Sequence, residues 1–217
     1  MKTVGILGGM GSMATVDLFS KIIKHTQVTC DQDHLHIIID NYAEIPDRTH
    51  YILHKEHNPL YKMIEAAKRL ESAGADILLM PCNTAHFFYE DLEKEIGIPI
   101  IHMMRETKKA VEGSLMLFAT EGTYAADLYK GVLYPDKEIQ TKITELIYDY
   151  KQHGKINDKT KASILKQITH VDGIILGCTE LPLIFNQEDT CIPLIDPTEI
   201  LARKAVKSAG AKLKEAT

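Results

Sequence analysis

The chain has 217 residues, of which 45% are hydrophobic and 25% are charged, and its formal net charge is -5. This size and apolar content suit one large or two small globular domains with buried cores. The negative charge argues against a surface for nucleic acid or anionic membrane. No apolar run approaches the roughly 20 residues that cross a bilayer, and no apolar leader with a cleavage site opens the sequence, which favours a cytoplasmic protein.

Short apolar runs alternate with amphipathic segments of helical length. The predicted strands, in chain order, are residues 4–7, 35–39, 77–80, 98–101, 115–118, 146–147, 174–176 and 192–195. Between the second and third, residues 59–72 carry apolar side chains at helical spacing, and Gly74 follows as a helix stop. Strands that alternate with helices predict an α/β protein with mostly parallel sheets.

The two halves of the sequence resemble each other. A shift of 96 residues aligns Asp76 with Asp172 and Cys82 with Cys178, and the segment 98–101 echoes 192–195. We therefore predict two similar parallel-sheet α/β domains related by a pseudo-twofold axis, with the active site in the cleft between them. Residues 1–101 form the first domain together with a returning C-terminal helix in 198–217, and residues 102–197 form the second.

The cysteines divide into two kinds. They are Cys30, Cys82, Cys178 and Cys191. None belongs to a C-x-x-C pair, which argues against a disulfide framework or a structural zinc site. A single free cysteine is usually a small buried hydrophobe. Cys82 and Cys178, however, are repeat-mates, and each follows an apolar run and precedes polar residues of the helix-capping type.

This placement predicts a chemical role for the two thiols. Ligands of open parallel sheets bind at the carboxyl ends of the strands, and the pseudo-twofold axis would bring Cys82 and Cys178 face to face there. Adjacent helix N-termini would lower each thiol pKa from about 8.5 toward neutrality. Two opposed acid/base groups suit racemisation, in which one thiolate removes an α-proton and the opposite thiol returns one on the other face.

Several motifs also resemble those of a known family. They are Leu7-Gly8-Gly9-Met10-Gly11, Asp40-Asn41-Tyr42, Ile45-Pro46-Asp47-Arg48-Thr49, Pro81-Cys82-Asn83-Thr84-Ala85-His86, Ala119-Thr120-Glu121-Gly122-Thr123 and Leu176-Gly177-Cys178-Thr179-Glu180-Leu181-Pro182. On these segments the chain resembles the aspartate/glutamate racemases over nearly its whole length. The resemblance implies a two-domain α/β fold, catalysis by Cys82 and Cys178 without cofactor or metal, and often a homodimer.

Two features bear on the place of the chain within that family. Glu180 resembles the aspartate racemase branch, because glutamate racemases usually carry histidine there. Ser12-Met13 departs from the pattern, in which proline and a variable residue are common, and this leaves the shape of the first loop open.

An acidic amino acid needs cationic partners. The guanidinium of Arg48 suits a carboxylate, and the resemblance assigns it to the side-chain carboxylate of the substrate. The competing interpretation is a surface ion pair with Asp47 or Glu44. Lys151 resembles the second cationic substrate ligand of the family, and its competing interpretation is a solvated charge.

Neutral polar groups complete the predicted site. Asn83, Thr84 and Thr179 offer donors that would stabilise negative charge on the substrate as the α-proton leaves. A shift of 110 residues, which aligns Leu7 with Leu117, aligns Met10 with Thr120. Thr120 is expected to line the cleft, and Met10 to shape the pocket. His86 stands four residues after Cys82, and we interpret it as a packed helix residue.

Other functions are compatible with parts of the sequence. Residues 9–14 fit a G-x-G-x-x-A dinucleotide fingerprint and Asp40 ends the next predicted strand, which would suit an NAD(P)-dependent oxidoreductase. That interpretation leaves the paired cysteines unexplained, as does a non-catalytic amino-acid-binding module. Maleate isomerase and hydantoin racemase activities stay open as related chemistries, although Arg48 argues against a neutral hydantoin. The choice between aspartate and glutamate depends on one methylene, which changes pocket energetics by only about 1–3 kcal/mol.

Overall fold

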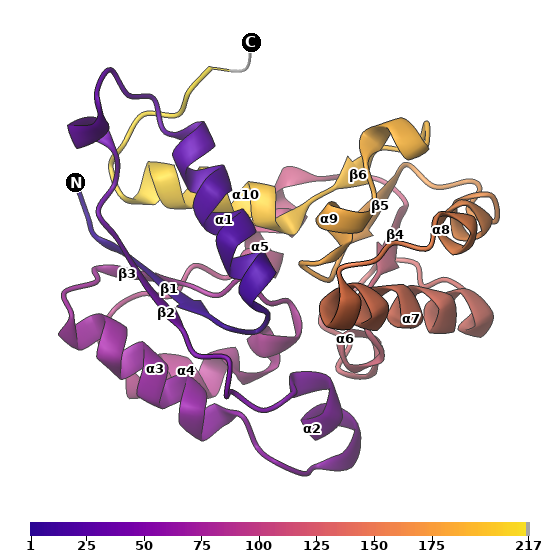
Figure 1. The fold of residues 1–217 in the computed structure, drawn as a ribbon, viewed down its shortest axis with the longest axis horizontal. Coiled ribbons are helices and arrows are strands. Elements are labelled where there is room, and N and C mark those ends of the chain that lie inside the picture. Colours follow the sequence, from indigo (N-terminus) through magenta and orange to yellow (C-terminus); the bar gives the residue numbers. More distant parts are fainter. Residues whose placement is uncertain (216–217) are drawn as a thin grey trace.

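The computed structural model describes residues 1–215, in which strands and helices alternate (Figure 1). The first half contains β1 (Val4–Gly8), α1 (Ser12–His25), β2 (Ile37–Asn41), α2 (Arg48–His54), α3 (Leu60–Ser72), β3 (Ile77–Leu79), a 3-10 helix (Thr84–Phe88), α4 (Tyr89–Glu95) and α5 (Met103–Ala110). The second half contains β4 (Leu115–Phe118), α6 (Glu121–Ala125), α7 (Lys137–His153), α8 (Asp158–Leu165), β5 (Gly173–Leu176), α9 (Leu181–Ile184), β6 (Leu194–Ile195) and α10 (Pro197–Ser208).

The strands form two parallel sheets, with orders β2-β1-β3 and β4-β5-β6. Each sheet is extended by a parallel bridge, from Leu78 to Ile100 in the first and from Met116 to Leu133 in the second. Including the bridges, β1 corresponds to β4, β3 to β5, and the Ile100 segment to β6. The two halves therefore repeat one topology, which makes the ends of β3 and β5 equivalent positions.

Helices cover both faces of the first sheet. Alternate residues of β1 point to opposite faces, so Val4 and Ile6 pack with α1, α5 and α10, while Leu7 packs with α3 and α4. The C-terminal helix α10 lies against α1 and α5, and Figure 1 shows it beside α1. The chain thus returns to the first sheet at its end.

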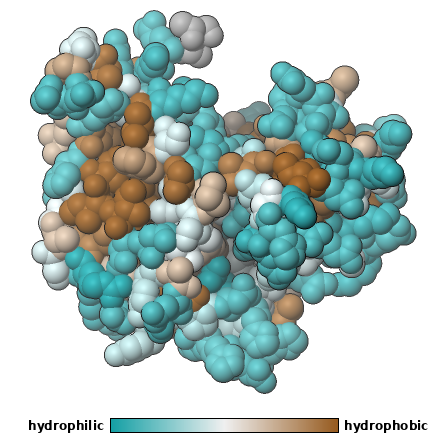
Figure 2. Space-filling view, viewed as in Figure 1, coloured by the Kyte–Doolittle hydropathy of each residue, from teal (hydrophilic) through white to brown (hydrophobic). Residues whose placement is uncertain are grey.

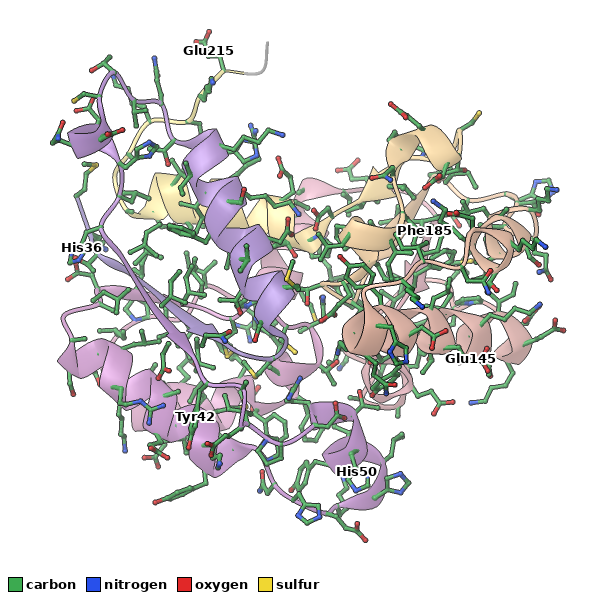
Figure 3. The ribbon with its side chains drawn as sticks, viewed as in Figure 1. His36, Tyr42, His50, Glu145, Phe185 and Glu215 are labelled. Atoms are coloured by element: carbon green, nitrogen blue, oxygen red, sulfur yellow. The ribbon has the colours of Figure 1, made fainter. Side chains whose placement is uncertain are left out.

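The second sheet has its own core. Phe118 and Leu176 pack with α7, α8 and α9, and Phe185 joins them with its ring 5.8 Å from that of Phe118 (Figure 3). On the opposite face, Leu117 packs with Tyr129 and with Met104 of α5. Helix α5 contributes to this core and also contacts α10, so both halves share it. The predicted domain boundary at residue 101 lies just before this helix, and the domain division stays a prediction.

Two strand predictions need correction. Residues 146–147 are not a strand but lie inside α7, because Ile139, Ile143, Leu146 and Ile147 follow helical spacing and all face the sheet. The place of that strand is taken by Leu133. Residues 98–101 form a single bridge at Ile100 rather than a strand.

None of the helices within residues 1–215 is both long enough and apolar enough to cross a membrane.

Candidate active site

The two predicted thiols line one pocket. Cys82 follows β3 and Cys178 follows β5, and their exposed fractions are 6% and 8%. The pocket between them measures only about 10 Å³, room for about one water molecule. Its lining comprises Met10, Asp47, Arg48, Thr49, Cys82, Asn83, Thr84, Thr120, Lys151, Cys178, Thr179 and Glu180. All ten predicted site residues are in this set, with Asp47 and Thr49 added to them.

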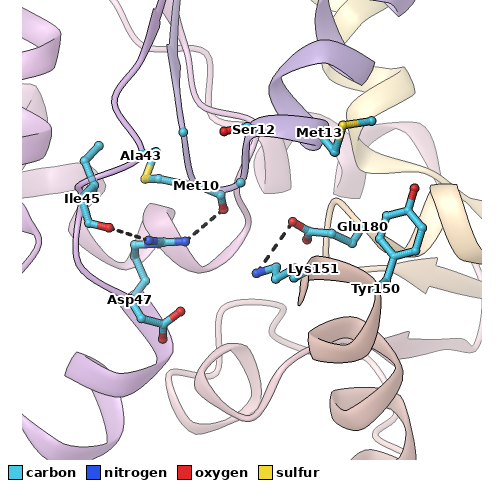
Figure 4. A pocket seen from close by; sticks show the side chains of 12 residues that line it. Met10, Ser12, Met13, Ala43, Ile45, Asp47, Tyr150, Lys151 and Glu180 are labelled. Atoms are coloured by element: carbon cyan, nitrogen blue, oxygen red, sulfur yellow. Dashed lines mark hydrogen bonds and ion pairs between the residues drawn. The ribbon is translucent and has the colours of Figure 1, made fainter. Parts of the chain in front are cut away.

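A wider pocket of about 400 Å³ adjoins the thiol pocket. The two share Met10, Asp47, Arg48, Lys151 and Glu180, and the wider one is bordered by the loop after β1 and the end of α7 (Figure 4). The thiol pocket is too small for an amino acid in this conformation. A substrate therefore fits between the thiols only when groups that line this pocket move.

Arg48 is a buried cation with donors to spare. Its Nη1 donates to the carbonyl of Ile45 at 3.2 Å and its Nη2 to the carbonyl of Met10 at 3.0 Å (Figure 4). Its Nη1 also donates to the carbonyl of Pro46 at 2.9 Å. Its Nε is buried and has no hydrogen-bond partner within residues 1–215. The interpretation as a surface ion pair is wrong, because Arg48 is 7% exposed and bonds to main-chain carbonyls. These bonds fix the guanidinium and leave N–H groups for an anionic ligand.

Cys178 lies beside a carboxylate. Its Sγ donates to Oε2 of Glu180 at 3.0 Å, and Oε1 of Glu180 lies 3.7 Å from Nζ of Lys151. Burial and the charge of Glu180 raise the pKa of the Cys178 thiol well above its usual value, and Lys151 only partly opposes them. The expected lowering of this pKa is therefore wrong. The following helix α9 has only four residues, too few for its dipole to offset the burial and the carboxylate.

Lys151 is the second cation of the site. Burial lowers its pKa, but the negative charges that Cys178 and Glu180 can carry outweigh burial, so that the net shift is upward. Lys151 therefore stays charged. Its side chain is 25% exposed and lines both pockets, so its role as a substrate ligand stays a prediction.

His86 is a packed helix residue, as predicted, and it lies outside the lining of both pockets. Its Nδ1 is 2.9 Å from the carbonyl of Cys82, and its Nε2 accepts from the main-chain N–H of Met103 at 3.2 Å. Since Nε2 accepts, Nδ1 carries the proton and the ring is neutral. Burial, with a smaller contribution from His102, lowers the His86 pKa to about 3.

Threonine hydroxyls join the two halves at the thiol pocket. Thr120 lies 3.2 Å from Thr49 and 3.5 Å from Thr84, and Thr84 lies 3.0 Å from Thr123. Thr179 donates to the carbonyl of Pro81 at 3.3 Å, from the second half to the first.

Sequence reasoning missed four of the residues around the site, of which Asp47 lines the thiol pocket. Thr49 and Thr123 are missing from the predicted set although both belong to quoted motifs. Tyr129, which donates to Asn83 at 2.5 Å, carries no motif signal.

The glycine loop after β1 is packed against protein. Gly9 has φ +85°, and a Cβ placed there would lie 2.4 Å from the main-chain carbonyl carbon of Tyr42. Asp40, the predicted ribose ligand of the dinucleotide hypothesis, is ion-paired with Arg69 at 2.8 Å. Both contacts disfavour a dinucleotide on this loop. Within residues 1–215, no group of three or more His, Cys, Asp or Glu side chains is placed to hold a metal ion.

Comparison with known proteins identifies the family. The model of the family described as Asp/Glu/Hydantoin racemase matches residues 7–205. The chain belongs to this family. The enzyme is therefore a racemase, an isomerase, and the oxidoreductase alternative is not favoured.

Two relatives that match this chain over nearly their whole length bear the names of racemases. The broad-specificity amino-acid racemase RacX of Bacillus subtilis is 29% identical, over 94% of this chain and 97% of its own. The structure of the aspartate racemase of Picrophilus torridus has a TM-score of 0.84 at 32% identity, covering 99% of this chain and 96% of its own.

Other structures share the two-domain α/β fold. An aspartate racemase homologue from Pyrococcus horikoshii OT3 has a TM-score of 0.76 at 27% identity, over 96% of this chain and 99% of its own. The glutamate racemase of Campylobacter jejuni shares the fold, with a TM-score of 0.70 at 16% identity, over 99% of this chain and 89% of its own.

Proposed function

We propose that this racemase interconverts L- and D-aspartate without a cofactor, by proton transfer between the substrate α-carbon and the thiols of Cys82 and Cys178. One observation carries the proposal: two cysteines at equivalent strand ends line a single buried pocket together with two cations, Arg48 and Lys151. Glutamate, one methylene longer, is a second candidate substrate.

The contacts of the site support distinct roles for its residues. Arg48 and Lys151 would hold the two carboxylates, because an acidic amino acid buries two negative charges that need partners. The hydroxyl of Thr84 and the amide of Asn83 would stabilise the negative charge that develops on the α-carboxylate as the proton leaves. Met10 and Thr120 would shape the pocket around the α-carbon.

The resting enzyme would hold Cys178 as the protonated thiol. Its Sγ–H donates to Glu180, and burial raises its pKa. In one direction, the Cys82 thiolate would remove the α-proton from one face while the Cys178 thiol delivers its proton to the other. After the transfer Cys82 is the protonated thiol and Cys178 the thiolate, which are the protonation states that the reverse direction requires. No net proton is consumed.

Chiral chromatography of purified enzyme with single enantiomers tests the proposal. Aspartate should racemise fastest, glutamate more slowly, and the variant with both Cys82→Ala and Cys178→Ala should be inactive. Faster turnover of alanine or serine than of both acidic amino acids would contradict the acidic-substrate assignment. It would favour the broad range named for the Bacillus relative. Turnover of a hydantoin or of maleate in preference to any amino acid would favour those family chemistries.

A homodimer is the proposed assembly. In sheet order, β2 is an edge strand, and its Ile39 is 39% exposed. The adjacent α1 exposes Val16 at 56% and Ile23 at 40%, and Figure 2 shows an apolar patch where α1 lies beside β2. An open apolar edge favours pairing with another strand. Light scattering should give twice the monomer mass, and Ile39→Lys should reduce it, whereas a wild-type monomer would contradict the assembly.

The cytoplasm is the proposed compartment, because catalysis by two free thiols needs surroundings that keep them reduced.

A further inference from the structure

Tyr129 connects the core of the second half to the thiol site. Its side chain is 0% exposed, packed among the apolar residues beneath β4. Its hydroxyl donates to Oδ1 of Asn83 at 2.5 Å. Asn83 follows Cys82 directly in the other half of the molecule, and Tyr129 lines neither pocket. The bond to Asn83 is therefore the direct link from Tyr129 to the lining of the thiol pocket.

The other end of the Asn83 side chain is unpaired. Its Nδ2 is buried and has no hydrogen-bond partner within residues 1–215, although Asn83 is 2% exposed and lines the thiol pocket. A buried amide N–H₂ without an acceptor is costly, and such groups in native proteins call for a partner. A carboxylate oxygen of a substrate in this pocket would supply an acceptor of matching charge.

The orientation of the asparagine amide decides whether this group attracts or repels a carboxylate. Rotation by half a turn would exchange the N–H₂ group for Oδ1 and direct oxygen lone pairs at the anion. Burial raises the pKa of Tyr129, which keeps its hydroxyl protonated and able to donate. A hydroxyl that donates to Oδ1 holds the N–H₂ group on the opposite side.

We propose that Tyr129 is a positioning residue: its hydroxyl fixes the Asn83 side chain so that Nδ2–H₂ faces the substrate α-carboxylate between the two thiols. This inference rests on the proposed racemase site. It adds a specific task for a tyrosine that does not touch the substrate.

A double-mutant cycle tests the proposal. Tyr129→Phe keeps the ring that fills the core and removes only the hydroxyl. We expect it to lower kcat/KM for racemisation at least tenfold, about the effect of losing one hydrogen bond to a charged group. In the Asn83→Ala background the same substitution should have no further effect, since the group that it orients is gone. Equal losses in both backgrounds, or full activity of Tyr129→Phe, would overturn the proposal.

Two further variants separate orientation from folding. Tyr124→Phe is the matched control, because Tyr124 is another tyrosine of this half whose hydroxyl bonds to main-chain groups, at Ala119 and Leu117. It should leave kcat/KM within a few-fold of wild type. Asn83→Asp keeps an acceptor for Tyr129 but has no N–H₂, and it should be impaired at least as much as Tyr129→Phe. Near-normal activity of Asn83→Asp would also overturn the proposal.

A spectroscopic measurement does not depend on the substrate. In ¹⁵N-labelled free protein, the side-chain amide signals of Asn83, identified by their absence from Asn83→Ala, should shift in Tyr129→Phe and not in Tyr124→Phe. If no acidic amino acid is racemised, the proposed function fails while this shift still reports the Tyr129–Asn83 bond. If racemisation is robust and the shift is absent, the positioning role alone fails.

Discussion

His86 should make the protein acid-sensitive. Its buried ring must be neutral, because Nε2 accepts from Met103 and Nδ1–H bonds to the carbonyl of Cys82. The His86 pKa falls from 6.5 to about 3 on folding. A lowered folded pKa contributes stability that is complete above the unfolded value and is lost as the pH falls from 6.5 toward 3. In the unfolded state His86 binds a proton at about pH 5, because this pH lies about 1.5 units below its unfolded pKa. Since the folded ring stays neutral at this pH, the unfolded state is favoured by about 2 kcal/mol more than at neutral pH.

Urea denaturation at about pH 7.5 and about pH 5 measures this loss. His86→Gln is the matched variant, because glutamine keeps one donor and one acceptor but does not titrate. His102, whose pKa is also lowered by burial, to about 4, remains in both proteins. The fall in unfolding free energy between the two pH values should be smaller by about 2 kcal/mol in His86→Gln than in wild type. An equal fall in both would refute the assignment of a neutral, locked His86.

Three further changes have defined outcomes. Glu180→Gln removes a charge that raises the Cys178 pKa, so iodoacetamide should modify Cys178 faster at mildly alkaline pH, by about tenfold for each unit by which the pKa falls. Mass spectrometry of the modified peptide measures the rate, and an unchanged rate would exclude the effect of the carboxylate. Arg48→Leu should lower kcat/KM for aspartate at least tenfold, because a charged hydrogen-bond partner is lost; unaltered kinetics would remove Arg48 from the site. Gly122→Ala should destabilise the fold by about 1–3 kcal/mol in a thermal or urea melt, because the new Cβ would lie 2.8 Å from Cα of Thr49. A melt equal to that of the wild type would show that α6 and α2 can move apart without cost.

The fold was predictable where the sequence pattern is unambiguous. The apolar runs of β1, β4 and β5 predict strands, and β1 and β5 are buried along their whole length. The apolar spacing of α3 predicts a helix. The pair Leu146-Ile147 could not be assigned alone, since two apolar residues fit either period. Only the longer series through Ile139 and Ile143 shows the helix that faces the second sheet.

The site was predictable to the extent that the repeat marks it. Matching Cys82 with Cys178 locates equivalent strand ends, and the resemblance to the racemase family adds the two cations, Arg48 and Lys151. The Cys178 pKa was not predictable, because it depends on burial and on a carboxylate two residues away whose side chain turns back to the sulfur. Tyr129 was not predictable either, since its contact with Asn83 spans 46 residues and belongs to neither repeat pattern.

Exchange of the α-proton in deuterated water with each single-cysteine variant tests the central claim most directly. Neither Cys82→Ala nor Cys178→Ala should racemise aspartate, because each thiol serves one face of the α-carbon. Each should exchange the α-proton of one enantiomer only, and the two variants should select opposite enantiomers. Near-normal racemisation by either variant would contradict the two-thiol mechanism, since one base would then suffice or another residue would supply the second proton.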